Sequence, residues 1–540
     1  MDRKKQVRLV GRIGALTVFM LVLLSACGGA AAPANTPAAV ATTAPAAAAT
    51  AAATGGALRI GLDVDAGTAD PRLFVDTSAA RLGELVYDGL VYIKPDFSPA
   101  PVLALSWDNP DDKTWIFHLR PGVKFHTGQA FTAADVKYTF DTILDPKFNS
   151  PQRGNLAVIT QVDVVDDNTV KFTLSSAFAP FLSYMGTGIV PKAVGEASGS
   201  DLANKPVGTG PFKFVNWQKG ATISFAANDT YWGGRPKLDR IDFKIVPDNS
   251  ARVVALEAGD LDFVLSPLSP QDVVRMSSKA GFKVERIPAA GYTYINLNCA
   301  DPIMSDVKVR QALSYLVNRQ QIISTVYKGI GTVGKGPIPP GMWAYSDDLP
   351  TYDYNVDKAK AMLDDAGWKA GADGKRAKNG QPLKITLLTH TEDPDRRTVI
   401  EALQAEFTKV GIQADTNVKA FASLLPDLTA GNYQFLVIGW LGLSNPDYSM
   451  FRQFSNGGAN NWGKCNDPAL DQLLRQARTT LDQTKAKDLY AQAAKLVVQN
   501  AYYIFLQNQE VITIHSDKLQ GFVMNPVNYF YSLRATSLGK

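Results

Sequence analysis

The sequence predicts a mixed α/β protein with at least two lobes. Strand-like runs such as "TVKFTL" (169–174) and "RIDFKIV" (240–246) alternate along the chain with helical segments such as "DRRTVIEALQAEFTKVG" (395–411). Behind an N-terminal segment, residues 55–540 make up 486 residues, which is too many for a single hydrophobic core. Neither an internal repeat nor an internal linker interrupts the alternation. These features predict an α/β or α+β body of two or more lobes.

Each expected element has its own periodicity. In the helix expected at 395–411 the apolar residues fall on one face, and Gly411 ends the helix because glycine readily adopts the left-handed conformation. That apolar face comprises Val399, Ile400, Leu403, Phe407 and Val410. The expected strands are 58–64, 114–119, 169–174, 221–227, 240–246, 292–298, 383–388 and 435–440. The expected helices are 135–144, 306–327, 357–367, 395–411 and 483–500.

The first 26 residues have the order of a secretory signal peptide. Basic side chains precede the apolar run Ile13–Leu24, whose 12 residues are too few to span a membrane. The next residues, "LSAC" (24–27), resemble the lipobox of bacterial lipoproteins, which implies cleavage before Cys27 and lipidation of its thiol; a plain secretory signal is the alternative. Residues 27–56 are rich in Ala, Thr and Pro and are expected to be a tether. The protein is therefore expected outside the cytoplasm, anchored by lipid to the outer face of the cytoplasmic membrane.

Charge and cysteine content limit the partners of the chain. The 55 Lys and Arg and 51 Asp and Glu become 50 of each sign once residues 1–26 are removed. A neutral protein without a basic cluster is not expected to bind nucleic acid. Cys299 and Cys465 can be two buried thiols, which we favour, or one long-range disulfide, which export permits.

The sequence predicts neither a metal centre nor a catalytic group. No histidine lies three to five residues from another histidine or a cysteine. The segment "GIGTVG" (329–334) fits a nucleotide-binding pattern, but "PIPP" (337–340) follows it and cannot begin the helix that phosphate binding needs, so a flexible loop is expected. We therefore expect no cofactor and no enzymatic activity. The four histidines are His118, His126, His390 and His515.

Four long blocks of the chain carry a family resemblance. They are 84–146, beginning "ELVYDGLVY", 206–264, beginning "PVGTGPFKF", 295–323, beginning "INLNCADP", and 466–478, "NDPALDQLLRQAR". Together, and in order, they resemble the extracytoplasmic solute-binding proteins of ABC importers, family 5, which contains oligopeptide-, dipeptide- and nickel-binding members. The resemblance extends across nearly all of residues 57–535.

This resemblance implies a bilobed periplasmic-binding-protein fold of type II, cluster C, with an extra domain inserted in lobe I. Two crossings between the lobes are expected near "GYTYINLN" (291–298) and "YYIFLQNQEV" (502–511), where they would act as hinges. The implied boundaries are 57–97, 205–290 and 505–540 for lobe I, 98–204 for the inserted domain, and 291–504 for lobe II.

The resemblance also implies the partners. A peptide or another small solute would bind in the cleft between the lobes, and the closed protein, a monomer, would deliver it to ABC permease subunits that work with their ATPase. Peptide import is the leading expectation, because it is the prevalent activity of the family. An oligosaccharide, a metal chelate or another solute without charged ends is the alternative.

The segment "GWLGLSNPDY" (439–448) is where the resemblance places ligand recognition. A similar Gly-Trp pair in peptide-binding relatives implies that Trp440 lines the cleft. In those relatives an aspartate for the peptide ammonium follows, whereas this chain has Leu443. Further along, Asp447 can cap the following helix or replace that aspartate.

The second charged anchor of the dipeptide-binding relatives is altered as well. Their arginine for the peptide carboxylate follows the strand before the 395–411 helix, where this chain has Thr389, His390 and Thr391. Burying an ammonium without a partner costs several kcal/mol, and a micromolar complex has only about 8 kcal/mol in total. A free dipeptide is therefore expected to bind poorly unless Asp447 or Asp76 moves in, whereas longer peptides and neutral solutes stay possible. Other side chains expected to bind ligand are Tyr294, Phe421, Asn445, Asn461 and Trp462.

Overall fold

An 11-stranded mixed sheet runs through residues 55–539, the part of the chain that the computed structural model describes. The predicted signal peptide, Cys27 and nearly all of the predicted tether lie outside these residues. The strand order is β18-β17-β19-β12-β20-β11-β1-β10-β9-β8, with β13 paired to β20 off this path. This arrangement is the α/β fold that the sequence predicts.

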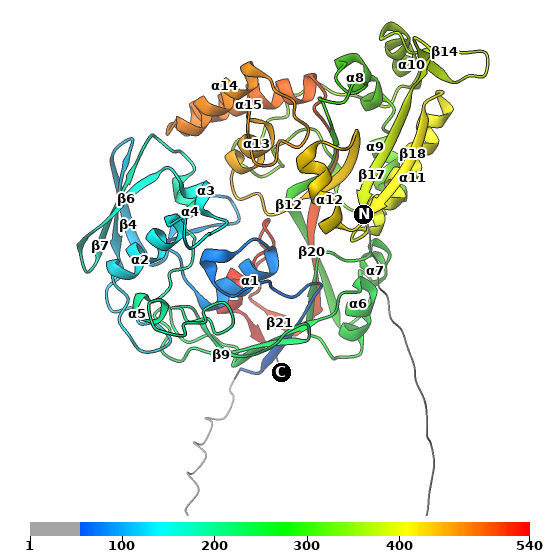
Figure 1. The fold of residues 1–540 in the computed structure, drawn as a ribbon. Helices are drawn as coiled ribbons and strands as arrows, with labels where there is room; N and C mark the ends of the chain where they lie inside the picture. The colour runs from blue at the N-terminus through cyan, green and yellow to red at the C-terminus, as the bar shows by residue number, and fades with distance from the viewer. Residues whose placement is uncertain (1–54, 540) are drawn as a thin grey trace, which may run out of the picture. The chain divides into compact units, whose positions relative to one another are not determined.

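The two longest strands, β12 (Phe282–Leu297) and β20 (Tyr503–Ser516), lie antiparallel at the centre of this sheet (Figure 1). Strand β19 (Phe435–Trp440) pairs with β12 from Tyr292 to Leu297, whereas β11 (Phe263–Leu265) pairs with β20 from Thr513 to His515. The pairing of β12 with β20 is interrupted between Pro288 and Tyr292. Both predicted crossings fall on these strands, so the sheet changes from one set of strands to the other along them.

On the side assigned to lobe I, β1 (Ala57–Leu62) pairs in parallel with β10 (Arg240–Ile245) and β11. Apolar side chains on these strands are buried against α1 (Thr77–Val86), which explains the strand-like runs at 58–64 and 240–246. The remaining elements here are η1 (Pro71–Leu73), β2 (Val91–Ile93), β8 (Phe212–Gln218), β9 (Thr222–Ala227), α6 (Asn249–Glu257), α7 (Pro270–Met276), β21 (Leu519–Gln520), η2 (Tyr531–Ala535) and β22 (Ser537–Leu538). The partner of β2, β3 (Pro99–Pro101), already lies within the predicted inserted domain.

A separate four-stranded antiparallel sheet, in the order β4-β5-β7-β6, forms within the predicted inserted domain. In β5 (Thr114–Leu119) and β7 (Thr169–Leu174) every second residue is buried, as expected of a sheet with one covered face. Helix α2 (Ala133–Leu144) covers that face with Val136, Phe140 and Ile143. The other elements are β4 (Ala104–Asp111), α3 (Arg153–Leu156), β6 (Ile159–Asp166), α4 (Phe181–Tyr184) and α5 (Lys192–Gly195).

On the side assigned to lobe II, α11 (Pro394–Lys409) packs its predicted apolar face on β17 (Lys384–His390) and β18 (Gln413–Lys419). The single helix expected at 306–327 is instead two helices, α8 (Val307–Tyr315) and α9 (Arg319–Thr325). Asn318 starts the second one by accepting a hydrogen bond from the backbone N–H of Gln321, so this side chain breaks the run. The other elements are α10 (Val356–Asp365), β14 (Lys369–Ala370), β15 (Arg376–Lys378), β16 (Gln381–Pro382), α12 (Phe421–Ala430), α13 (Pro446–Phe454), α14 (Pro468–Thr479) and α15 (Gln483–Gln499).

The glycine-rich segment 329–334 is not a free loop. Its residues Thr332 and Val333 form the short strand β13, which pairs with Asn508 and Gln507 of β20. The side-chain amide of Gln507 donates to the carbonyl oxygen of Ile330 at 2.7 Å. The segment therefore extends the central sheet and does not begin a helix that could hold phosphate.

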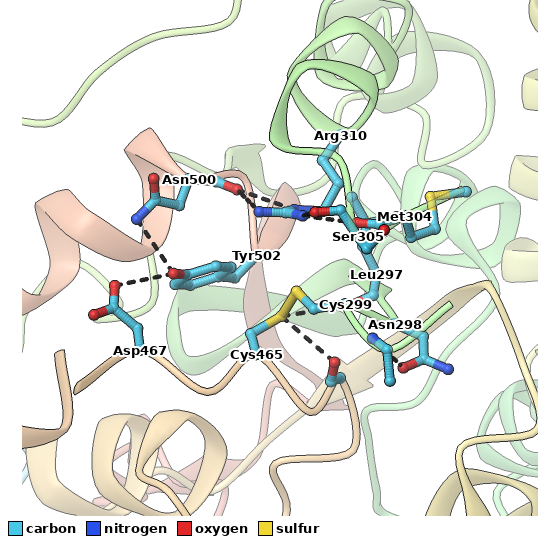
Figure 2. Close-up of a disulfide and its surroundings, with 12 residues drawn as sticks. Leu297, Asn298, Cys299, Met304, Ser305, Arg310, Cys465, Asp467, Asn500 and Tyr502 are labelled. Atoms are coloured by element: carbon cyan, nitrogen blue, oxygen red, sulfur yellow. Dashed lines mark hydrogen bonds between the residues drawn. A yellow bond between two sulfur atoms is a disulfide. The ribbon is translucent and has the colours of Figure 1, made fainter. Parts of the chain in front are cut away.

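Cys299 and Cys465 are joined in a disulfide and are not the two thiols that we favoured. The bond links the end of β12 to the loop before α14, across a sequence separation of 166 residues. Figure 2 shows Arg310 nearby, where its guanidinium donates to the carbonyl oxygens of Asn500 and Met304. The disulfide therefore ties the central sheet to the helical layer of α14 and α15.

Candidate ligand-binding site

A cavity of about 620 Å³ lies where distant segments of the chain meet. Its volume falls within the range of about 300–1,000 Å³ that is usual for small-molecule sites. One wall comes from the strands and loops assigned to lobe I, another from the inserted domain, and a third from the end of β19 and from α13. The lining segments fall within 71–102, 151–155, 183–188, 440–452 and 525–534.

Trp440, at the end of β19, is one of the lining residues. Its ring centroid lies 6.1 Å from that of Trp462 and 6.3 Å from that of Tyr448. A β-carbon at position 439 would overlap Nη2 of Arg396, and Gly442 has a φ of +74°, which only glycine adopts easily. The glycines on both sides of Trp440 therefore let the strand pass over Arg396 and turn, while the indole stays at the cavity.

The lobe I wall carries a stack of two aromatic rings and a guanidinium. Tyr92 and Tyr531 are stacked with their ring centroids 3.6 Å apart, and Cζ of Arg534 lies 3.5 Å from the Tyr531 centroid. Nη1 of Arg534 lies 3.3 Å from Oδ1 of Asp88 and donates to the hydroxyl of Tyr231 at 2.7 Å. Asp88 thus already neutralises the charge of Arg534. The guanidinium of Arg534 in turn holds the ring of Tyr531 in place.

The other carboxyl groups of this wall are engaged as well. Oδ1 of Asp76 accepts a hydrogen bond from the backbone N–H of Ala79 at 2.7 Å and so caps α1. Oε2 of Glu84 accepts from the backbone N–H of Phe530 at 2.6 Å. Burial raises the pKa of Glu84 to about 7, although the charge of Arg534 acts to lower it. Asp76 is therefore already used at the start of α1, and Glu84 is only partly ionised at neutral pH.

Arg452 brings a second guanidinium to the cavity from the last turn of α13. Its Nε donates to Oδ1 of Asn460 at 3.1 Å, and its Nη1 to Oδ1 of Asn155 at 3.4 Å. Cζ lies 4.7 Å from the ring centroid of Tyr448. These partners are neutral and come from two sides of the cavity, since Asn155 belongs to the predicted inserted domain.

Asp447 lies behind this wall with only 1% of its surface exposed. Arg478 places Nε 3.4 Å from Oδ1 of Asp447, yet neither carboxylate oxygen has a hydrogen-bond partner among the described residues. Burial raises the pKa of Asp447 to about 6, against the lowering effect of Arg478 and then Arg452. The cap of α13 is Asn445, which accepts from the backbone N–H of Tyr448 at 2.8 Å, and not Asp447.

Arg478 also connects the predicted inserted domain to lobe II. Its backbone carbonyl oxygen accepts a hydrogen bond from the N–H of Ala179 at 2.9 Å. Cζ of its guanidinium lies 3.9 Å from the ring centroid of Phe451 in α13 and 4.9 Å from that of Phe178. Arg478 therefore joins the predicted inserted domain to α13 and α14.

Two of the ten residues expected to bind ligand, Trp440 and Asp76, are on the cavity wall. Leu443 is fully buried in the hydrophobic core, where its N–H donates to the carbonyl oxygen of Ala290 at 3.0 Å. Tyr294 is also fully buried and stacks on Tyr503 with ring centroids 4.4 Å apart. Asn445 and Asp447 are buried in α13.

The other four expected residues are not among those that line the cavity. Trp462 packs behind Trp440, and the side-chain amide of Asn461 donates to the carbonyl oxygen of Ser455 at 3.0 Å. His390 lies between Glu392, 3.0 Å from its Nδ1, and Arg396, 2.6 Å from its Nε2. Phe421 packs edge-on against His390 with a centroid distance of 5.5 Å. A direct contact of these four with ligand stays a prediction.

Sequence reasoning missed most of the lobe I wall. Tyr92 and Glu84 lie in the "ELVYDGLVY" block, which carried the family resemblance, and a search for polar residues in that block would have found them. Tyr531 and Arg534 lie near the C-terminus, more than 400 residues away in sequence, and no local pattern marks them. Arg452 could not be predicted from a local pattern either, because an arginine on a helix is typical of an ordinary surface residue.

Within residues 55–539, no group of three or more His, Cys, Asp or Glu side chains is placed to hold a metal ion. None of the described helices is long and apolar enough to cross a membrane. Aromatic rings, amides and charged side chains line the cavity.

Comparisons with known proteins agree with this arrangement. The family model described as bacterial extracellular solute-binding proteins, family 5 Middle, matches residues 98–462. Heme-binding protein A of Haemophilus influenzae is 31% identical over 86% of this chain and 89% of its own length. The dipeptide-binding protein of Escherichia coli is 31% identical over 85% of this chain and 90% of its own. The crystal structure of the oligopeptide-binding protein AppA of Bacillus subtilis with a nonapeptide matches with a TM-score of 0.80 and 27% identity, covering 90% of this chain and 100% of that one.

Proposed function

Because the chain belongs to family 5 of the bacterial extracellular solute-binding proteins, we propose that it captures peptides in the 620 Å³ cavity for import. It is an extracytoplasmic solute-binding protein of ABC import and not an enzyme. Delivery would take the loaded protein, as a monomer, to the membrane permease subunits and their ATPase. Membership of the family shows solute binding, and the peptide as the solute is what we propose in addition.

The cavity walls support a peptide ligand. Trp440 and Tyr448 lie on one side and Tyr92 and Tyr531 on the other, so side chains of a peptide can pack against aromatic rings on both sides. Amide and hydroxyl groups, including those of Asn155 and Asn525, can bond to a peptide backbone. Relatives described as dipeptide- and oligopeptide-binding share the fold and about 30% of the sequence.

The same aromatic walls favour a second candidate, a solute that stacks on rings and lacks charged ends, such as an oligosaccharide or a metal chelate. The lobe I carboxyls support it, because Asp76 caps a helix and Asp88 is paired with Arg534. A relative described as heme-binding protein A has the same level of identity as the dipeptide-binding one.

Closure of the cavity would use the two long strands. Lobe I (57–97, 205–290 and 505–540) with its inserted domain (98–204) and lobe II (291–504) would rotate about β12 and β20. The interruption of the ladder between Pro288 and Tyr292 supports a hinge there, because fewer backbone hydrogen bonds resist bending. Ligand would then be enclosed and shielded from water.

Attachment to the membrane would come from the N-terminus. Cleavage before Cys27 and lipidation of its thiol would anchor the protein to the outer face of the cytoplasmic membrane, with residues 27–56 as the tether. Replacement of Cys27 by Ser is expected to release the protein into the soluble extracytoplasmic fraction, as judged by fractionation and by the mass of the N-terminal peptide. Retention of the variant in the membrane fraction would contradict lipid anchoring.

Native mass spectrometry of protein purified without denaturation tests the ligand class. The expected result is a mass excess that fragments into peptide ions, because closed binding proteins retain ligand through purification. A Trp440→Ala variant purified in parallel is the control and should retain less. A mass excess that corresponds to a sugar or a metal chelate would contradict the peptide and support the second candidate.

A further inference from the structure

Three cations line the cavity, and they differ in how their charge is balanced. Arg534 is paired with Asp88 at 3.3 Å, and Lys94 lies 3.5 Å from Asp96 in an exposed pair. For Arg452, no carboxylate among the described residues comes within ion-pair distance. Among the cations that line the cavity, Arg452 is therefore the one whose charge is not balanced by a nearby carboxylate of the described residues.

The region behind Arg452 does not supply the missing charge. Asp447 is the carboxylate closest in sequence, and Arg478 takes it with an Nε to Oδ1 distance of 3.4 Å. Two guanidiniums thus act on a single carboxyl group, and because burial raises the pKa of that group to about 6, it loses its charge as the pH falls towards 6. An excess of about one positive charge remains on this wall.

The side chain of Arg452 is nevertheless held in place. Asn460 accepts from Nε and Asn155 from Nη1, while the ring of Tyr448 lies 4.7 Å from Cζ. Nη2 has no hydrogen-bond partner among the described residues. Neutral acceptors and an aromatic ring thus orient the guanidinium without neutralising its positive charge. Its outer N–H groups can therefore bind both oxygens of a carboxylate.

We propose that Arg452 binds a carboxylate of the ligand, and for a peptide the C-terminal one. This inference rests on the proposed peptide-binding function. It places the acidic end of the peptide between α13 and Asn155 of the inserted domain, so that the same contact reads the ligand and joins two walls. The arginine position of the dipeptide-binding relatives, here His390, lies off the cavity, and α13 supplies the cation in its place.

Among the described residues, every carboxyl group that lines the cavity already has a partner within the protein, so none is free for the amino end of the peptide. Asp76 caps α1, Asp88 is paired with Arg534, and Glu84 has a pKa raised to about 7 by burial. An ammonium therefore gains little from this cavity, whereas a carboxylate gains an oriented guanidinium. Blocking the two ends of a peptide should have unequal effects on binding.

The test uses an equimolar mixture of synthetic tri- to pentapeptides, each as free acid, C-terminal amide and N-acetyl acid, with retention read by native mass spectrometry. The wild type should retain the free and N-acetylated acids at least about tenfold over the amides. Arg452→Gln should retain acids and amides alike, and Arg452→Lys, which keeps the charge but loses the fork, should be intermediate. The control Arg475→Gln removes an exposed arginine paired with Asp471 on α14 and should behave as the wild type.

Each alternative outcome has a distinct meaning. Equal retention of acids and amides by the wild type, or an unchanged preference in Arg452→Gln, would overturn the role of Arg452 and leave peptide binding intact. Retention of no peptide by the wild type would overturn the proposed function, and the inference with it. Thermal unfolding of each variant is measured alongside, and Arg452→Lys keeps the test decisive should Arg452→Gln fail to fold.

Discussion

At the scale of single residues, the cavity depends on a tryptophan between glycines. Trp440 stays at the cavity because Gly439 leaves room for Arg396 and Gly442 allows the chain to turn at a φ of +74°. The indole is packed against Trp462 and Tyr448 but remains half-buried, so part of its surface is free for a ligand.

Replacing Trp440 by Ala should weaken ligand binding by at least about tenfold, because an aromatic contact in a buried site contributes a kcal/mol or more. The melting temperature should change little, since the ring is only half-buried. Calorimetry with the ligand identified in the wild type measures the loss. The control Trp107→Ala removes another half-buried indole on β4, away from the cavity, and should bind normally. Unchanged affinity in Trp440→Ala would refute its role.

Asp447 predicts a specific dependence of stability on pH. Its folded-state pKa is raised from 3.8 to about 6 by burial, so the folded protein holds this proton more tightly than the unfolded chain. The cost of ionised Asp447 is absent below about pH 4, grows between pH 4 and 6, and is complete above pH 6. Asp447→Asn should therefore be more stable than the wild type at pH 8, by up to about 3 kcal/mol, and similar at pH 4.

Thermal or urea unfolding at both pH values checks this expectation. Asp415→Asn is a suitable control, because its carboxylate is exposed and paired with Lys384 on the edge of the sheet. That variant should show no gain at pH 8. A loss of stability in Asp447→Asn at pH 8 would mean that the ion pair with Arg478 outweighs the burial of the carboxyl.

The residues of the site were harder to predict than their segment. The family resemblance pointed to 439–448, and Trp440 and Asp76 do lie at the cavity. Leu443 lies in the hydrophobic core. The order of residues along the chain does not show which side of a turn faces solvent, so the sequence could not predict this burial. Tyr531 and Arg534 reach the cavity only through the tertiary fold, which no local pattern encodes.

At the scale of elements, periodicity predicted the strands and helices well where they bury one face. The alternation in β5 and the apolar stripe of α11 are examples. It failed at 306–327, where the apolar spacing continues through a break that Asn318 makes by capping α9. A capping side chain inside a periodic run is a signal that hydrophobic spacing alone overlooks.

The disulfide between Cys299 and Cys465 is expected to stabilise the sheet and helical layer that it joins. Because it closes a loop of 166 residues, removing it should cost about 2–5 kcal/mol of unfolding free energy. Urea unfolding of a variant with both cysteines changed to Ser measures the loss. Reduced wild type is the control and should resemble the variant. Equal midpoints for oxidised, reduced and double-serine protein would contradict the expectation.

At the scale of the whole molecule, two long strands and a few side-chain contacts connect the parts that surround the cavity. β12 and β20 are shared by both sides of the sheet, with an interruption between Pro288 and Tyr292. Across the cavity, Arg478 contacts Phe178 and Phe451. The parts around the cavity are thus joined by the two long strands and by side-chain contacts, of which the Arg478 cluster is one.

Replacing Arg478 by Met should loosen the second connection while keeping an unbranched side chain. Without ligand, the variant should have a larger radius of gyration in small-angle X-ray scattering, because the predicted inserted domain loses its contact with α13 and α14. Arg475→Met, on the same helix, is the matched control. An unchanged radius of gyration would show that the Arg478 contact does not hold the walls together.

The Arg478 contact is made by protein groups alone, and this has a consequence for affinity. A ligand that binds only the closed conformation has an apparent dissociation constant divided by the fraction of molecules already closed. Raising that fraction from about 1% to about 10% would tighten binding about tenfold for every ligand, whatever its chemistry. Substitutions at Phe178, Phe451 or Arg478 could therefore set how strongly the protein binds, while the cavity residues set what it binds.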